Sequence, residues 1–80
     1  MSDGSISDLE LAMYNRLVAG KPQIKVVMLI ARTFEADALP ADDCIDAALE
    51  RLAARHDIET FGLIKRWRHS EIRRLPTTPG

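Results

Sequence analysis

The residues best suited to chemistry lie near the C-terminus. There, His69, Ser70 and Glu71 are consecutive, and these residue types occur in nucleophilic catalysis. Neighbouring residues of a strand point to opposite faces of a sheet, so we do not expect His69 to activate Ser70. No glycine-rich nucleophile turn accompanies the three residues. We therefore predict that the protein is not an enzyme and has no catalytic residues.

Structural roles are expected for the same residues. We predict an ion pair between Glu71 and Arg66 or Arg73, and a hydrogen bond from Ser70 to a backbone group at a strand edge. The two histidines and the single cysteine lack the short spacing of zinc ligands. The glycines are too scattered for a phosphate-binding loop. Neither a metal nor a cofactor is expected.

Charge is distributed unevenly along the chain. The 11 basic and 12 acidic residues nearly cancel, but residues 1–61 hold six basic and eleven acidic side chains, whereas residues 62–80 hold five and one. We predict that a negative scaffold presents a positive C-terminal segment as its working surface. The predicted binding residues are Arg66, Trp67, Arg68, Ser70, Glu71 and Arg73.

A basic segment around a tryptophan is also typical of nucleic-acid binding. Its cations would contact phosphates while Trp67 or His69 stacks on a base. The alternatives are that the cations only cover and solubilise an edge strand and that Trp67 belongs to the core. Docking of the preceding helix in a major groove is disfavoured, because its first two turns carry carboxylates that repel phosphate: Asp42, Asp43 and Asp46.

Three helices are expected to position this segment. The first begins at Ser7, because Ser7 and Glu10 have capping-box spacing, and it stops at Gly20. Residues 23–35 keep helical spacing after Pro22, although Val26 to Ile30 is also compatible with a buried strand. A loop over 36–40 leads to a third helix over 41–56, whose buried stripe is Ile45, Ala48, Leu49 and Leu52.

Two strands are expected to follow, over 58–63 and 67–75, paired as a hairpin that turns at 64–66. Residues 1–5 and the proline-containing tail 76–80 are expected to be disordered. This order predicts an α+β fold, a single three-helix winged-helix-like domain over 6–75 with a C-terminal β-hairpin.

Nothing in the sequence indicates secretion or a membrane. Cys44 is the only cysteine, the N-terminus lacks a basic start followed by an apolar run, and the longest apolar run is far shorter than the roughly 20 residues that span a bilayer. A cytoplasmic location is expected.

The run Gly62-Leu-Ile-Lys-Arg-Trp-Arg-His-Ser-Glu-Ile-Arg-Arg-Leu-Pro resembles the closing motif of DUF3658, a bacterial domain family of unknown function. That motif has a glycine, a short turn and then Arg-Trp-Arg-x-Ser-Glu-Val-Arg-Leu. The resemblance implies a winged-helix-like fold and a bacterial origin, with no established activity. Arg74, inserted before Leu75, departs from the family pattern.

The expected function is therefore that of a small non-enzymatic interaction module acting through contacts with a protein partner or with a second copy. The alternative is a nucleic-acid-binding protein that uses the basic hairpin. No membrane contact and no small-molecule cofactor are expected.

Overall fold

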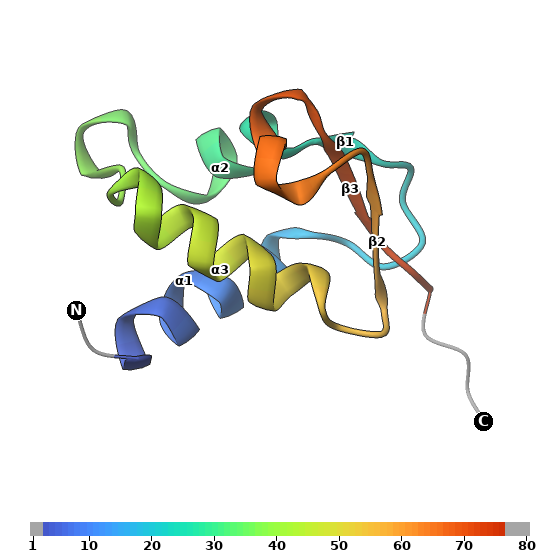
Figure 1. Cartoon of the computed structure of the whole chain (residues 1–80). Helices are drawn as coiled ribbons and strands as arrows, with labels where there is room; N and C mark the ends of the chain where they lie inside the picture. Colours follow the sequence, from blue (N-terminus) through green and yellow to red (C-terminus); the bar gives the residue numbers. More distant parts are fainter. Residues whose placement is uncertain (1–2, 77–80) are drawn as a thin grey trace.

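The computed structural model describes residues 3–76, which form three α-helices, a three-stranded antiparallel sheet and two short 3-10 helices (Figure 1). In chain order these are α1 (Asp3–Arg16), β1 (Ile24–Lys25), α2 (Val26–Thr33), η1 (Ala36–Ala38), α3 (Asp42–Ala53), β2 (Ile58–Phe61), η2 (Ile64–His69) and β3 (Glu71–Arg74). Within this described range, none of the helices has the length and apolar character needed to cross a bilayer.

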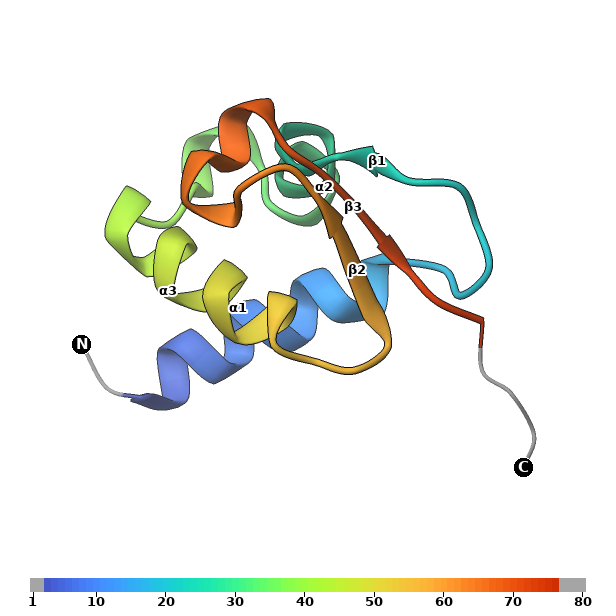
Figure 2. The ribbon, with the colours of Figure 1, turned by 45° about the vertical axis from the view of Figure 1, so that its right-hand side comes forward.

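The sheet has the order β1-β3-β2, so the last strand is the central one. Ile72 on β3 lies opposite Ile24 on β1 and Thr60 on β2, and it is fully buried. Figure 1 and Figure 2 show α1 and α3 side by side, the sheet at one end of this pair, and α2 with η2 above it. The core lies between these layers, and its largest fully buried side chains are Met13, Val26, Leu29, Leu49, Leu52 and Ile72.

The three α-helices were predicted correctly, but their first and last residues differ from the predicted ones. The stripe predicted for α3 is buried, and the segment after Pro22 is a helix rather than a strand. Its first residues, Ile24 and Lys25, instead form β1, which the periodicity did not predict. A strand of two residues depends on its partner β3 and leaves no pattern of its own.

The predicted capping box at the start of α1 is wrong. The helix already begins at Asp3, so Ser7 and Glu10 lie inside it. Their side chains make tertiary contacts instead: Arg51 donates to the Ser7 hydroxyl, and Glu10 pairs with Arg55. Disorder was also predicted over 1–5, and residues 3–5 are helical; residues 1–2 and 77–80 lie outside the described part.

The hairpin was predicted correctly as a pair but wrongly in its second strand. Strands β2 and β3 pair antiparallel, with Glu59 opposite Arg73. The predicted strand over 67–75 begins only at Glu71, because η2 occupies 64–69 and packs on α2 and α3. Gly62 starts this departure with a φ of +95°, a backbone conformation that favours glycine.

Candidate functional site

Trp67 is a core residue and only 6% exposed, which agrees with the alternative that placed it in the core. Its indole N–H donates to Asp46 on α3 at 2.5 Å, and the Arg68 guanidinium lies over the ring, 4.2 Å from its centroid. The ring therefore fastens η2 to α3. A buried ring covered by an arginine is not a free platform for stacking on a base.

Most of the C-terminal cations contact the protein's own carboxylates. Arg68 pairs with Asp42 at 2.8 Å and Arg73 with Glu59 at 2.8 Å. Arg74 lies 4.0 Å from Asp57 and also donates to the Leu17 carbonyl. The exposed Arg68 pair contributes no more than about 1 kcal/mol, so its role is mainly positional.

The predicted working surface is correspondingly smaller. Among the described residues, Lys65 and Arg66 on η2 have no ion-pair partner, and both are exposed. The ion pair predicted for Glu71 is wrong, because Arg73 pairs across the sheet with Glu59 and Arg66 lies on η2 without a carboxylate partner in the described part.

Ser70 has the structural role that the sequence predicted. It is 2% exposed, and its hydroxyl lies 2.6 Å from the Leu63 carbonyl oxygen and 3.0 Å from that of Arg66. Its own carbonyl accepts a hydrogen bond from the Val26 N–H. Because this hydroxyl serves the η2 backbone, it is not presented as a nucleophile to the exposed His69.

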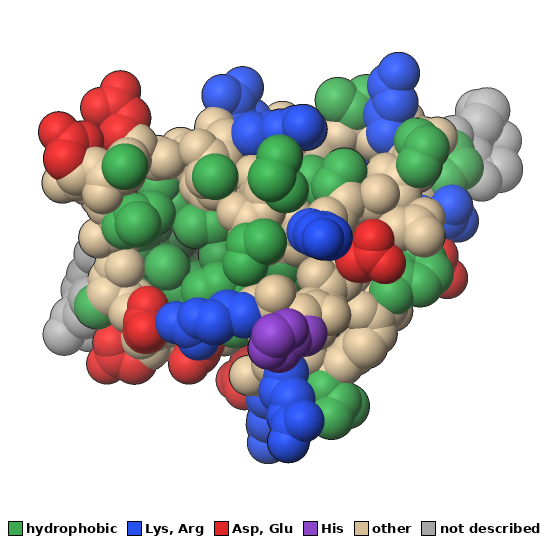
Figure 3. Space-filling model, turned by 90° about the horizontal axis from the view of Figure 1, so that it is seen from above, with side chains coloured by type: hydrophobic (Ala, Val, Ile, Leu, Met, Phe, Trp, Pro, Cys, Tyr) green, Lys and Arg blue, Asp and Glu red, His purple; other side chains and the backbone are tan. Residues whose placement is uncertain are grey.

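An apolar groove beside Trp67 was not predicted. It has a volume of about 440 Å³ and lies between α2, the η1 segment and η2. Figure 3 shows this hollowed apolar surface towards the left of the view, with basic side chains and a histidine on one side of it. Its lining residues, called the groove residues below, are Val27, Ile30, Ala31, Phe34, Ala36, Leu39, Trp67 and Arg68.

The sequence held one signal for the groove. Helix α2 is apolar on more of its surface than the core covers, since Val27 remains 36% exposed and Met28 45% exposed. Leu39, between η1 and α3, is 52% exposed. Apolar side chains left uncovered and close together mark an interaction surface more often than isolated ones.

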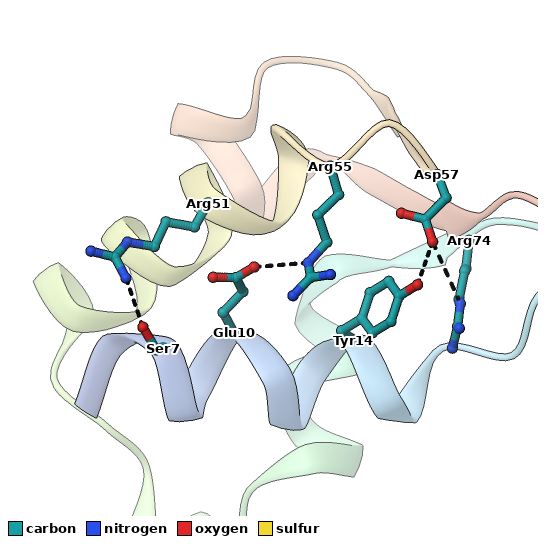
Figure 4. A network of polar contacts seen from close by, with 7 residues as sticks. All are labelled: Ser7, Glu10, Tyr14, Arg51, Arg55, Asp57 and Arg74. Atoms are coloured by element: carbon teal, nitrogen blue, oxygen red, sulfur yellow. Dashed lines mark hydrogen bonds and ion pairs between the residues drawn. The ribbon is translucent and has the colours of Figure 1, made fainter. Parts of the chain in front are cut away.

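A polar network on the opposite side joins α1 to the end of α3 and to β3 (Figure 4). The Tyr14 ring lies between two guanidinium groups, that of Arg55 at 4.2 Å and that of Arg74 at 4.0 Å from the ring centroid. The Tyr14 hydroxyl donates a hydrogen bond to the Asp57 carboxylate. No pattern in the sequence indicated this network, because Tyr14 and Asp57 are brought together only by the packing of α1 on α3.

The hydrogen bond between Tyr14 and Asp57 shifts the pKa of both side chains. It raises the pKa of Tyr14 above 10.0, with partial burial acting in the same direction. It also lowers the pKa of Asp57 below 3.8, although burial opposes this shift. The network is therefore complete when Tyr14 is protonated and Asp57 is ionised, and it stabilises the fold at neutral pH.

Replacing Tyr14 by Phe is expected to lower the urea midpoint between about pH 5 and about pH 9, and this difference should shrink towards both extremes. The stability linked to Asp57 is present above 3.8 and is lost as the pH falls through the folded-state pKa. The stability linked to Tyr14 is present below 10.0 and is lost as the pH rises through its folded-state pKa. Urea titrations across this range test the effect. A difference that does not change with pH would contradict it.

The described residues contain no group of three or more His, Cys, Asp or Glu side chains arranged to hold a metal ion. Comparison of the chain with protein-family models, with curated proteins and with solved structures finds no match.

Proposed function

We propose that this chain is a winged-helix-like domain of the DUF3658 type from a bacterial cytoplasm. The element order supports the fold: a helix, a strand, two helices and two further strands, with the first strand pairing with the last. The DUF3658-like residues also take defined places. Gly62 turns the chain, Trp67 anchors η2, and Ser70 and Ile72 are buried at the start of β3.

The proposed function is that of a non-enzymatic interaction module acting through protein contacts. The observation that carries this proposal is the open apolar groove between α2, η1 and η2. A chain of 80 residues needs most of its large apolar side chains for its core. Large apolar side chains that stay exposed and lie close together therefore favour a protein partner. Arg68, which both stacks on Trp67 and pairs with Asp42, supplies a polar rim.

Nucleic-acid binding is less well supported by the same residues. The segment that would form a protruding wing is the 3-10 helix η2, packed on α2 and α3. Two carboxylates of α3 hold it, Asp42 through Arg68 and Asp46 through Trp67. With Lys65 and Arg66 as the unpaired cations of η2, the slope of log affinity against log salt on duplex DNA would be only about −2.

The groove is expected to bind peptides, and a glutamate placed in it should weaken that binding at least about tenfold because an unpaired charge would be buried. The test is a selection from a displayed random-peptide library. Binding is then followed by the emission of Trp67, the only tryptophan and a groove residue. The variant is Ala31→Glu in the groove, and the matched control is Ala19→Glu in the exposed turn before Gly20.

Labelled duplex and single-stranded DNA are titrated in parallel by anisotropy. Peptide ligands that Ala31→Glu loses and Ala19→Glu keeps support the proposal. Micromolar DNA binding that weakens with salt, together with no groove-dependent peptide, would overturn it in favour of a nucleic-acid binder.

A further inference from the structure

We infer that the groove is the contact surface for a second copy of this chain, with two grooves facing each other across a two-fold axis. This inference deepens the proposed function, on which it rests, by naming the partner. It is carried by the charges at the two ends of the groove.

One end of the groove is acidic. Ala36 and Leu39 line it there, and the residues on either side of Ala36 are Glu35 and Asp37. Both carboxylates belong to exposed residues and have no ion-pair partner in the described part of the chain. The η1 segment therefore presents negative charge beside an apolar floor.

The unpaired charges at the other end are basic, because the Asp42 carboxylate there is paired with Arg68 and the Asp46 carboxylate accepts the Trp67 indole N–H. Trp67 and Arg68 line this end, and the preceding η2 residues, Lys65 and Arg66, are exposed cations without a carboxylate partner among residues 3–76. A shallow basic surface made by Lys65, Arg66, Arg68 and His69 continues from the groove at Arg68. Figure 3 shows acidic side chains at one corner of this face and, across the apolar surface, basic side chains with further acidic ones beside them.

A groove that is acidic at one end, apolar in the middle and basic at the other is complementary to itself. A two-fold rotation brings the η1 end of one copy against the η2 end of the other, so each ionic contact occurs twice. Apolar groove residues that are open to solvent, such as Val27, then meet at the centre. Opposite charges at the rim fix orientation and register.

An acidic peptide or a nucleic acid in the groove would meet like charge at the η1 end. An acidic peptide that pairs with Lys65 and Arg66 would place further carboxylates near Glu35 and Asp37. A nucleic acid would be repelled by the η1 end in the same way. A second copy supplies both signs in the required order, which is why we favour it over an acidic peptide or a nucleic acid.

The contact is expected to be weak. A standard interface covers about 800 Å² on each partner, which is about 15% of the 5334 Å² of accessible surface of this chain. The groove is one local feature of this surface, so we expect the contact to cover less than a standard interface. We expect a dimer with a Kd on the order of 10 µM at low salt, weakening as salt screens the rim charges.

The experiment is a charge exchange followed by sedimentation equilibrium of the full chain. Asp37→Arg places positive charge at the acidic end, and Arg66→Glu places negative charge at the basic end. Each variant alone faces two like-charge contacts and should dimerise at least about tenfold more weakly than wild type. An equimolar mixture pairs Arg with Glu at one end and Asp with Arg at the other, so it should regain a Kd within about threefold of wild type.

The controls are Asp8→Arg and Lys21→Glu, which change the same charges at exposed sites outside the groove. Circular dichroism checks that every variant is folded. Recovery in the mixture, with both controls dimerising as wild type, supports the inference. A monomer at every concentration, or single variants that dimerise as wild type, overturns it. Peptide binding that Ala31→Glu abolishes would then still support the proposed function, so the two failures are distinguishable.

Discussion

Replacing Trp67 by Ala is expected to lower the free energy of unfolding by about 3–5 kcal/mol. The ring is the largest side chain of the core, and it joins η2 to α3 through the bond to Asp46. Arg68 loses the ring it stacks on, and the groove loses a wall. A domain of this size has only about 5–15 kcal/mol to lose, so the variant should be partly unfolded near physiological temperature. Urea denaturation followed by circular dichroism measures the loss, because the variant has no tryptophan emission.

Two further variants separate the ring from its hydrogen bond. Trp67→Phe keeps an aromatic ring without the N–H donor, and Asp46→Asn keeps an oxygen acceptor without the charge. We expect Asp46→Asn to cost about 1 kcal/mol and Trp67→Phe to fall between it and Trp67→Ala. A loss below about 1 kcal/mol for Trp67→Ala would show that η2 does not depend on this ring.

The helices could be predicted from the sequence because their apolar residues repeat with the helical period. The stripe through Ile45, Leu49 and Leu52 has one buried face whatever the helix packs against. Their ends were less predictable. Ser7 and Glu10 have the spacing of a cap, yet Arg51 on α3 and Arg55 just after it bind them inside α1. Local spacing does not reveal a partner more than forty residues away.

The basic segment illustrates a second limit. Its residues were expected to alternate across a strand, with Trp67 and Arg73 on one face and Arg68 and Ser70 on the other. The segment instead forms the 3-10 helix η2, which packs on α2 and α3 and buries the Trp67 ring. Two of the three α3 aspartates that were predicted to repel phosphate, Asp42 and Asp46, hold η2 through Arg68 and Trp67. Which charges remain unpaired is a property of the tertiary structure.

The groove depends on the same tertiary packing. Helix α2 is unusually apolar, but only the positions of η1 and η2 determine which of its side chains stay uncovered. Its polar ends come from residues that have no pattern in the sequence, Glu35 and Asp37 in one segment and Lys65 and Arg66 in another. The self-complementary arrangement therefore appears only when both segments are placed in space.

Replacing Ser70 by Ala is expected to lower the free energy of unfolding by about 1–3 kcal/mol, although only one oxygen atom is removed. The hydroxyl donates to the carbonyls of Leu63 and Arg66, and water cannot easily take its place because Ser70 is only 2% exposed. Gly62 lies against the same oxygen, so the loss also loosens the turn into η2.

Ser7→Ala is the matched control, since it removes a hydroxyl that accepts a bond from Arg51 at the exposed surface of α1. It should stay within about 0.5 kcal/mol of wild type. Hydrogen exchange gives a second measurement, because the Val26 N–H donates to the Ser70 carbonyl and should exchange faster in Ser70→Ala as the junction of β3 with α2 opens. Equal stability of the two variants, with unchanged exchange at Val26, would mean that the Ser70 hydroxyl does not hold η2 in place.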